Sequence, residues 1–401
     1  MNRVVITGLG IISPIGNDAA MVSEVLHAGQ PAIAPLMRIA TDNLIVKIGA
    51  EVKDFDVAAR FDEKKLQLLD RASQFALAAA DQAVKQSGVD FRELAARGAI
   101  IIGSGVGGIT TLDECFHRVY AEGAKRVHPL TVPKLMISAA MSHISIEYGI
   151  TGPSFTVASA CASANHAVGV AYQMVKSGAV VAAITGGTEA PLTFGTLKGW
   201  EALRVMSPDT CRPFAKNRSG MVLGEGAGIF VIENRDYAIA RGATIVAEIA
   251  GFGMSSDASD IVLPKADGAA AAMRACLADA ALNPEDIGYI NAHGTGTPAN
   301  DPTETKAIRT VFGAHADKLA VSSTKSLHGH ALGAAGALEL AATIIAMNAG
   351  FIPPTANFTE ADPACDLDYV PNAAREKPFA IALSNSFAFG GHNAVVAVRK
   401  P

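Results

Sequence analysis

A cysteine at a small-residue turn has the surroundings of a catalytic nucleophile. Cys161 stands in VASACASANHAVG, after an apolar strand-like run and at the expected start of a helix, between Ala160 and Ala162. Unpaired N–H groups and the positive dipole at a helix start favour a thiolate and stabilise a nearby oxyanion. The strand, turn and helix together resemble a nucleophile elbow. We therefore predict that Cys161 forms a covalent intermediate.

Two histidines stand in comparable surroundings. His293 follows the strand-like run YINA in NAHGTGTPAND, where glycines and threonines leave it facing a cavity. His330 stands in SSTKSLHGHALGAAGALE, at the position that corresponds to the Cys161 turn if the chain is duplicated. In that case Cys161 and His330 can approach each other, and His293 joins them from an adjoining strand end.

The remaining cysteines and most other histidines are expected to be structural. Free cysteine is among the most buried residue types, and a lone histidine is usually a satisfied polar group. For His328 and His392 the sequence does not decide between a structural and a functional role. The structural interpretation applies to Cys115, Cys211, Cys276 and Cys365, and to His27, His117, His128, His143, His166 and His315.

Signatures of metal and nucleotide binding do not appear in the sequence. No closely spaced pair of cysteine or histidine ligands typical of zinc is present. The glycine-rich segments GLG, GSGVGG and GTGT do not form a dinucleotide fingerprint, and Lys325 in SSTKS follows no phosphate-binding glycine loop. We therefore predict no cofactor.

The strands and helices that must position these residues form an internal repeat, and its second copy starts near residue 245. RVVITGLGIISPIG corresponds to IVAEIAGFGMSSDAS, and the alanine-rich segment 76–90 corresponds to 269–286. SFTVASACASANHAVGVAYQMVKSG matches LAVSSTKSLHGHALGAAGALELAATIIAMNAG, and the paired apolar runs after residues 178 and 378 match each other. We predict an N-terminal half over 1–244, with an insertion at about 107–150, and a C-terminal half over 245–401.

Apolar strands alternating with helices predict an α/β protein with two stacked layers of largely parallel sheet. The helices after residues 161 and 330 are apolar nearly all round, so we expect them between the two sheets. The insertion has the amphipathic character of a lid or a dimer contact.

The composition of the chain excludes several classes of protein. The 401 residues are 50% hydrophobic and 18% charged, which excludes a disordered chain. A net charge of -5, from 33 basic and 38 acidic residues in a mixed pattern, argues against nucleic-acid or membrane-surface partners. The apolar stretch 331–347 contains Glu339 and is short for a membrane span, so we expect a buried helix. The five scattered cysteines fit a reducing cytoplasm.

These motifs resemble the elongating type II β-ketoacyl-[acyl carrier protein] synthases, condensing enzymes of the thiolase superfamily. The likeness spans the whole chain. It rests on RVVITGLGIISPIG, GSGVGG, ASACASA, RPFAKNRSGMVLGEGAG, NAHGTGTPAND, KSLHGHALGAAGALE and SNSFAFGGHNAVV. The resemblance implies a thiolase-like fold of two duplicated halves, layered as an α/β/α/β/α sandwich.

The resemblance also implies a role for each matching residue. Cys161 accepts the acyl group, and His293 and His330 promote decarboxylation. Further roles are support of the site (Lys325, Glu339), gating (Phe389), contact with the pantetheine arm (Thr295, Thr297), the acyl pocket (Val106, Gly107) and a monovalent cation position (Asn291, Glu339, Ser384, Asn385).

The implied reaction is a decarboxylative Claisen condensation. An acyl group held on Cys161 condenses with malonyl-acyl carrier protein and gives 3-oxoacyl-acyl carrier protein, in fatty acid elongation or polyketide-type elongation of the polyene or nodulation type. Two neutral imidazole donors suit the enolate that decarboxylation creates. The oxyanion of the condensation step would accept hydrogen bonds from the backbone N–H groups of Cys161 and Phe389.

Some features depart from the family pattern, and rival functions stay open. Most relatives carry glycine at the position of Ala388 and threonine at that of His392, so we expect a stiffer gate and a specialised acyl range. A degradative thiolase would need a second catalytic cysteine, but Cys365 lacks the matching Cys-x-Gly pattern. The other rivals are an initiating synthase, a subunit of a specialised ketosynthase heterodimer, and a cysteine hydrolase.

The expected partners are an acyl carrier protein and a second subunit. The family pairs through a sheet edge, which is a liability when bare, so we expect a homodimer and leave a heterodimer open. An acidic carrier protein would need basic side chains on this chain, and the candidates are Lys64, Lys65, Lys125, Arg126 and Arg212.

Overall fold

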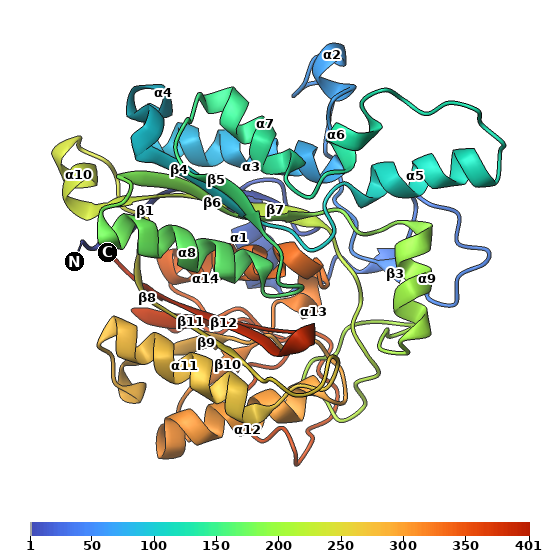
Figure 1. Cartoon of the computed structure of the whole chain (residues 1–401). Coiled ribbons are helices and arrows are strands. Elements are labelled where there is room, and N and C mark those ends of the chain that lie inside the picture. Colours follow the sequence, from blue (N-terminus) through green and yellow to red (C-terminus); the bar gives the residue numbers. More distant parts are fainter. Residues whose placement is uncertain (1) are drawn as a thin grey trace.

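The computed structural model describes residues 2–401 and has five layers (Figure 1). Helices α3 and α7 cover one sheet, α8 and α14 lie between two sheets, and α11 and α12 cover the second. The strands are β1 (Val4–Ile12), β2 (Ala34–Pro35), β3 (Ile48–Gly49), β4 (Gly98–Gly103), β5 (Ser154–Val157), β6 (Ala182–Glu189), β7 (Gly226–Asn234), β8 (Ala247–Ser256), β9 (Tyr289–Asn291), β10 (Ala320–Ser322), β11 (Ile381–Ala388) and β12 (His392–Arg399). The helices are α1 (Ala19–Ala28), α2 (Glu63–Leu66), α3 (Arg71–Ser87), α4 (Phe91–Leu94), α5 (Ile109–Tyr120), α6 (Thr131–Leu135), α7 (Ala139–Tyr148), α8 (Ser163–Ser177), α9 (Phe194–Ala202), α10 (Arg235–Ala240), α11 (Ala266–Ala280), α12 (Asn300–Phe312), α13 (Lys325–His328) and α14 (Ala335–Ala349).

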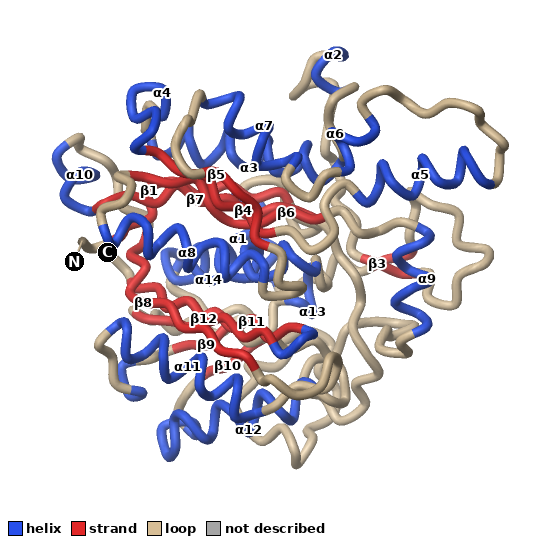
Figure 2. Tube along the Cα trace, in the orientation of Figure 1, coloured by secondary structure: helices blue, strands red, loops and turns tan. Residues whose placement is uncertain are grey.

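The two sheet layers are halves of one ten-stranded sheet. Its order is β10-β9-β11-β12-β8-β1-β7-β6-β4-β5, and only three residue pairs between β1 and β8 join the halves. Reading outward from this joint, the order β1-β7-β6-β4-β5 matches β8-β12-β11-β9-β10, with the same strand directions at each step. The predicted duplication and layered α/β fold are therefore confirmed (Figure 2).

The expectation of largely parallel sheets holds for four of the five strands in each half, and one strand, β7 or β12, runs antiparallel to the rest. In each half, two of the four strand pairings are parallel and two are antiparallel. The strands are nevertheless apolar throughout, because helices cover both faces of each half-sheet. Burial on both faces gives continuous apolar runs whatever the direction of the neighbouring strand.

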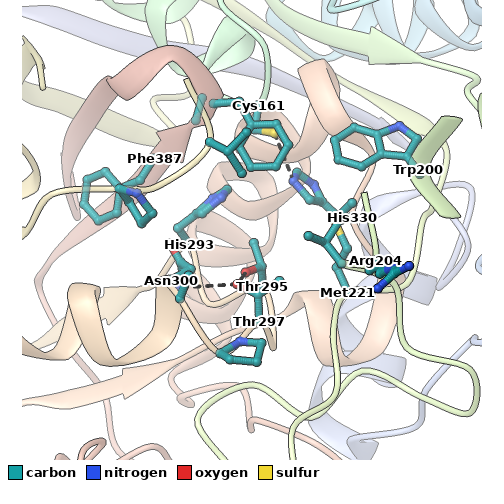
Figure 3. Close-up of a pocket in the computed structure, with 17 residues that line it drawn as sticks. Cys161, Trp200, Arg204, Met221, His293, Thr295, Thr297, Asn300, His330 and Phe387 are labelled. Carbon is teal, nitrogen blue, oxygen red and sulfur yellow. Dashed lines mark hydrogen bonds between the residues drawn. The ribbon is translucent and has the colours of Figure 1, made fainter. Parts of the chain in front are cut away.

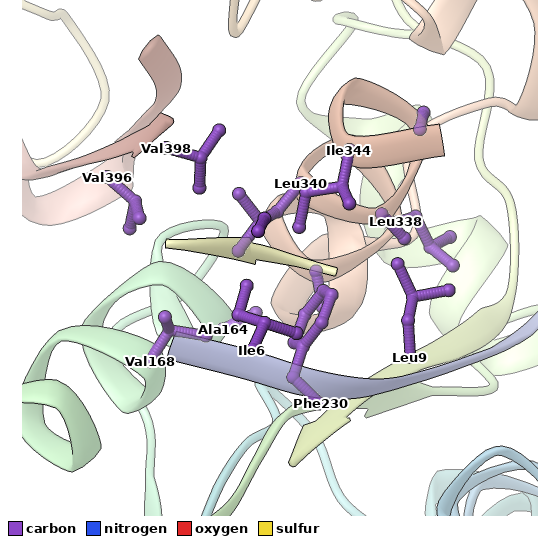
Figure 4. Close-up of a cluster of buried hydrophobic side chains, with 14 of the residues drawn as sticks. Ile6, Leu9, Ala164, Val168, Phe230, Leu338, Leu340, Ile344, Val396 and Val398 are labelled. Carbon is purple, nitrogen blue, oxygen red and sulfur yellow. The ribbon is translucent and has the colours of Figure 1, made fainter. Parts of the chain in front are cut away.

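Small residues let the central helices lie close to the strands. A Cβ atom on Gly187 of β6 would be 2.7 Å from Cβ of Ala164 in α8, and one on Gly228 of β7 would be 2.7 Å from the carbonyl oxygen of Ala337 in α14. The core between the sheets is formed by side chains from both central helices and both half-sheets, including Ala164, Val168, Leu340, Phe230 and Val396 (Figure 4).

Helix α14 is the core helix that the apolar stretch predicts. Every residue from Ala335 to Met347 is buried, Glu339 included. Within residues 2–401, the segment Leu332–Ala349 is the one helical stretch long and apolar enough to cross a membrane, but 89% of it is buried inside the protein.

The insertion near 107–150 connects β4 to β5 and carries α5, α6 and α7. Helix α7 packs against α3, whereas α5 extends away from the layers (Figure 1). The predicted division at 244/245 falls between α10 and β8, and it stays a prediction.

Candidate active site

The Cys161 turn connects β5, which ends at Val157, to α8, which begins at Ser163. Ala160 lies at φ 49°, a left-handed conformation that is uncommon for a residue with a side chain and typical of strained functional turns. The Ser163 hydroxyl fixes this turn: it donates to the Ala160 carbonyl at 2.6 Å and accepts from the Ser159 N–H at 2.9 Å. The turn presents the sulfur of Cys161 to a cavity while leaving the residue only 6% exposed.

Both predicted histidines line the cavity that the sulfur faces. His330 Nε2 is 3.1 Å from Cys161 Sγ, and the rings of His293 and His330 are 5.4 Å apart at 84°. Figure 3 shows the two rings pointing toward Cys161 from separate segments. Thr295 and Thr297 line the same cavity of about 180 Å³.

Burial controls the ionisation of the cysteine. It raises the pKa of Cys161 to about 12, although the nearby Lys325 ammonium acts in the opposite direction. The prediction that the helix start favours a thiolate is therefore wrong for the resting site, because the loss of hydration outweighs the local dipole. The resting group is a thiol, and His330 Nε2 is placed to accept its proton.

Both imidazoles are neutral near pH 7. Burial lowers the pKa of His293 and of His330 well below 6.5, and the positive charge of Lys325 lowers each pKa further. A neutral imidazole keeps one N–H group, which it can donate to a developing oxyanion. The cavity therefore holds two uncharged imidazoles, of which His330 faces the sulfur through Nε2.

Lys325 and Glu339 lie behind His293 rather than in the cavity. The Lys325 ammonium donates to the His293 carbonyl oxygen at 2.6 Å and forms a fully buried ion pair with Glu339. Burial raises the pKa of Glu339 to about 7 and Lys325 opposes that rise. The pair holds the His293 backbone, and the Lys325 charge adds to the effect of burial in keeping both imidazoles neutral.

Three buried carboxylates were missed by sequence reasoning. Glu304 accepts from the N–H of His293 at 2.9 Å and of Gly294 at 2.8 Å, while Asp301 accepts from the N–H of Gly296 at 3.2 Å. Asp301 stands in the first turn of α12 and Glu304 one turn later, and acidic residues three apart after NAHGTGTPAN were a signal that could have revealed them. The third, Glu189, gave no sequence signal.

Glu189 fixes the loop that contains Val106 and Gly107. Its carboxylate accepts from the N–H of Val106 at 3.2 Å and from the N–H of Gly333 at 2.9 Å, close to His330 in the chain. Val106 is 38% exposed, and neither Val106 nor Gly107 lines the cavity of Cys161. Their acyl-pocket role stays a prediction.

The predicted cation ligands converge only in part. Asn291 donates to the Glu339 carbonyl oxygen at 3.1 Å, while Glu339 Oε2 and Ser384 Oγ are buried without a hydrogen-bond partner among residues 2–401. Oxygen donors of this kind suit a hard cation. The Asn385 side chain instead donates to Glu304 at 3.2 Å, on the opposite face of β11, because neighbouring strand residues alternate between faces.

The gate segment has ordinary backbone geometry at Ala388, with φ -119° and ψ 158°. Alanine is therefore unstrained in this conformation, and any stiffening must act on other conformations of the segment. Phe389 lines the cavity, and His392 is exposed beside Gly390.

His328, the other histidine whose role the sequence left undecided, is structural. Its ring contacts the Gly329 carbonyl oxygen and the Thr324 hydroxyl.

The five basic candidates differ in their charge partners. Lys65 pairs with Glu147 and Arg212 pairs with Asp209. Across residues 2–401, no ion pair involves the other three, which are exposed: Lys64, Lys125 and Arg126.

Two duplicated half-sheets that place a cysteine and two neutral histidines at one central cavity define a condensing enzyme with the thiolase fold. Comparisons with known proteins agree. The family models described as Beta-ketoacyl synthase, N-terminal domain and C-terminal domain match residues 1–238 and 246–359. The chain belongs to the β-ketoacyl synthase family and is an acyltransferase of that family.

Relatives match over the whole chain. Nodulation protein E of Rhizobium sp. (strain N33) is 48% identical over 402 residues, 99% of each chain. The 3-oxoacyl-[acyl-carrier-protein] synthase 2 of Staphylococcus aureus (strain COL) is 42% identical and covers 99% of this chain and 98% of its own. The solved structure titled "The ishigamide ketosynthase/chain length factor" has a TM-score of 0.95 and 37% identity, with 100% of this chain and 99% of that chain covered.

Proposed function

We propose that Cys161, His293 and His330 carry out the decarboxylative condensation of an acyl group with malonyl-acyl carrier protein. The observation that supports this most directly is the convergence of one thiol and two neutral imidazoles on a single cavity. In the first step, His330 accepts the Cys161 proton and the sulfur attacks the acyl thioester. The acyl group moves to Cys161, and the carrier thiol leaves with a proton.

In the second step His330 must carry its proton on Nε2, so that both imidazoles act as hydrogen-bond donors. The bond between Cα and the carboxylate of the malonyl group breaks, carbon dioxide leaves, and N–H groups of His293 and His330 stabilise the enolate oxygen. The enolate carbon attacks the acyl carbonyl on Cys161, the C–S bond breaks, and the released thiolate takes a proton that comes from water. The backbone N–H groups of Cys161 and Phe389 would hold the intermediate oxyanion, and the product is a 3-oxoacyl thioester.

The remaining residues would prepare the site. Lys325, Glu339 and Glu304 hold the His293 segment, and Thr295 and Thr297 would contact the pantetheine arm along the cavity. A monovalent cation held by Asn291, Glu339 and Ser384 would offset the buried carboxylate charge.

We propose an acyl carrier protein as the partner that delivers both substrates. Exposed Lys64, Lys125 and Arg126 would meet its acidic surface, and exposed Arg204 stands at the cavity lining. A second copy of this chain would cover the edge strand β5, whose Phe155 is 41% exposed. A chain-length-factor subunit, of the kind named for the ishigamide structure, is the alternative occupant.

We infer a specialised elongation pathway in the cytoplasm. Higher identity to Nodulation protein E, 48%, than to synthase 2, 42%, favours a nodulation-type branch over primary fatty acid synthesis. The scattered free cysteines fit a reducing compartment.

One incubation tests the reaction. The enzyme is mixed with octanoyl-acyl carrier protein and then malonyl-acyl carrier protein, and intact masses of the enzyme and carrier are recorded. We expect an octanoyl adduct on the wild type, none on Cys161→Ala, and a carrier-bound product two carbons longer. Release of octanoic acid without use of malonyl groups would instead identify a hydrolase.

A further inference from the structure

A buried carboxylate at the end of β6 receives four hydrogen bonds. Glu189 is fully buried and is the last residue of that strand. It accepts from the Ser104 hydroxyl at 2.9 Å and from the N–H groups of Gly105 at 2.6 Å and Val106 at 3.2 Å, all in the turn after β4. The fourth donor is the N–H of Gly333 at 2.9 Å, in the other half of the chain. The carboxylate therefore joins two segments that are far apart in the sequence.

The turn after β4 has an equivalent in the second half of the chain. Strand β4 corresponds to β9 in the duplicated sheet order, and these strands end at residues 103 and 291. Glu189 accepts from the second and third N–H groups after β4. Glu304 accepts from the second and third N–H groups after β9, and the first of these two belongs to His293. One buried carboxylate thus holds the same positions of the turn in each half.

Glu189 also binds the segment that carries His330. Gly333 stands three residues after His330, and between them Leu332 lies at φ 45°, a left-handed conformation that costs energy for a residue with a side chain. A Cβ atom on Gly333 would be 2.5 Å from a carboxylate oxygen of Glu189, so the two segments are in direct contact. The hydrogen bond from Gly333 therefore helps to hold this strained turn in place.

The ring of His330 depends on its backbone for its orientation. Its Nδ1 atom is buried without a hydrogen-bond partner among residues 2–401, and its Nε2 atom contacts Cys161 (Figure 3). The main-chain N–H and carbonyl groups of His330 bind residues 222–224 at 2.7 and 3.0 Å. These bonds fix one side of the turn, and the bond between Gly333 and Glu189 fixes the other side.

The donors around Glu189 suit an ionised carboxylate. A carboxylate only accepts hydrogen bonds, and all four groups around it are uncharged donors. Burial raises the pKa of Glu189 to about 7, while the four hydrogen bonds act in the opposite direction. A side chain at this position must therefore offer acceptors to both segments at once.

We propose that Glu189 is a positioning residue for His330, as Glu304 is for His293. This inference rests on the proposed acylation of Cys161. Glu189 does not line the cavity and acts through the backbone. It keeps the His330 segment against the turn after β4, and so keeps Nε2 of His330 at the distance at which it accepts the Cys161 proton.

Glu189→Asp should break this connection and keep the charge. The aspartate side chain is one methylene shorter, so its carboxylate cannot reach the turn after β4 and Gly333 together. A displacement of about 1 Å at a catalytic group can cost about a hundredfold in rate. We therefore expect acylation by octanoyl-acyl carrier protein at about pH 8 to fall about ten- to a hundredfold. Glu189→Gln should recover part of this loss, because its amide oxygen still accepts from two N–H groups.

A double-variant cycle distinguishes positioning from a general effect on folding. Because Glu189 acts through His330, Glu189→Asp should change acylation by less than about threefold in the His330→Ala background. In the His293→Ala background it should keep its full effect. A loss of folded enzyme would instead lower the rate by one factor in every background. Glu189→Ala, which removes both acceptor oxygens, is taken through the same cycle.

A second buried carboxylate supplies the matched control. Glu233 is fully buried in β7, and it binds Thr7 and Arg241 outside the cavity. Glu233→Asp makes the same chemical change without touching either active-site segment, so acylation should stay at the wild-type rate.

The outcomes separate the role of Glu189 from the proposed function. If the wild type forms no octanoyl adduct on Cys161, the proposed function fails and the role of Glu189 fails with it. If the adduct forms but Glu189→Asp lowers acylation by the same factor in the wild type and in His330→Ala, the positioning role is overturned. Unchanged acylation in both Glu189→Asp and Glu189→Ala would overturn it as well. A loss confined to backgrounds that retain His330 supports it.

Discussion

Replacing each active-site histidine separately should change the rates of acylation and decarboxylation by different factors. His330 Nε2 is 3.1 Å from Cys161 Sγ, whereas the His293 ring stands beside the His330 ring in the same cavity, with the ring centroids 5.4 Å apart. His330 is thus placed to take the thiol proton and to donate to the enolate, while His293 serves only the enolate. His293→Ala should slow decarboxylation alone, and His330→Ala should slow both acylation and decarboxylation.

The magnitude follows from the loss of one buried donor. A preorganised donor to a developing oxyanion is typically worth about 2.7–4 kcal/mol, which corresponds to about a 10²–10³-fold change in rate. His293→Ala should therefore reduce decarboxylation by that factor and leave acylation within about threefold of wild type. The double variant should lose less than the product of both factors, because the two donors act on one oxygen.

Two separate assays measure the steps. Acylation is followed by the intact mass of the enzyme after mixing with octanoyl-acyl carrier protein, and decarboxylation by carbon dioxide released from malonyl-acyl carrier protein. His315→Ala is the matched control, because that histidine contacts the Ile287 carbonyl oxygen outside the cavity and should change neither rate. Equal losses of acylation and decarboxylation in His293→Ala would refute the assignment.

Three further perturbations test other parts of the structure. Because burial raises the pKa of Cys161 to about 12, its alkylation by iodoacetamide should speed up about tenfold per pH unit between pH 7 and 9, and a plateau near pH 8 would contradict this. Ala388→Gly should broaden the range of acyl chains elongated, as measured by product mass; an unchanged profile would remove the stiff-gate hypothesis. Glu225→Ala leaves the buried Arg71 guanidinium without its bidentate partner, so urea unfolding should show a loss of about 3–5 kcal/mol in stability, whereas a loss below about 1 kcal/mol would show that the pair is dispensable.

Local sequence patterns predicted the architecture well, because the faces of a helix or strand that are buried must carry apolar residues at a regular spacing. Continuous apolar strands, all-apolar central helices and the paired segments of the two halves led to a duplicated, layered α/β fold. The same patterns could not give the strand directions, since a strand covered by helices on both faces is apolar in either kind of pairing. Each predicted parallel sheet in fact contains one antiparallel strand.

The residues of the candidate site were likewise only partly predictable from the sequence. Turn chemistry and motif resemblance singled out Cys161, His293 and His330, which the fold brings to one cavity. Asp301 and Glu304 were missed although they stand near their partners in the sequence, and Glu189 was missed because its partners lie on distant segments of the chain. Contacts of this kind have no periodicity in the sequence.

The sequence by itself determined which residue types are available for chemistry and which segments alternate between strand and helix. Only the tertiary structure decided that Cys161 rests as a thiol, that both imidazoles stay neutral and that Glu189 joins the turn after β4 to the His330 segment. The physical reason is that burial and electrostatic interactions depend on distances between groups far apart in the chain, and folding sets those distances.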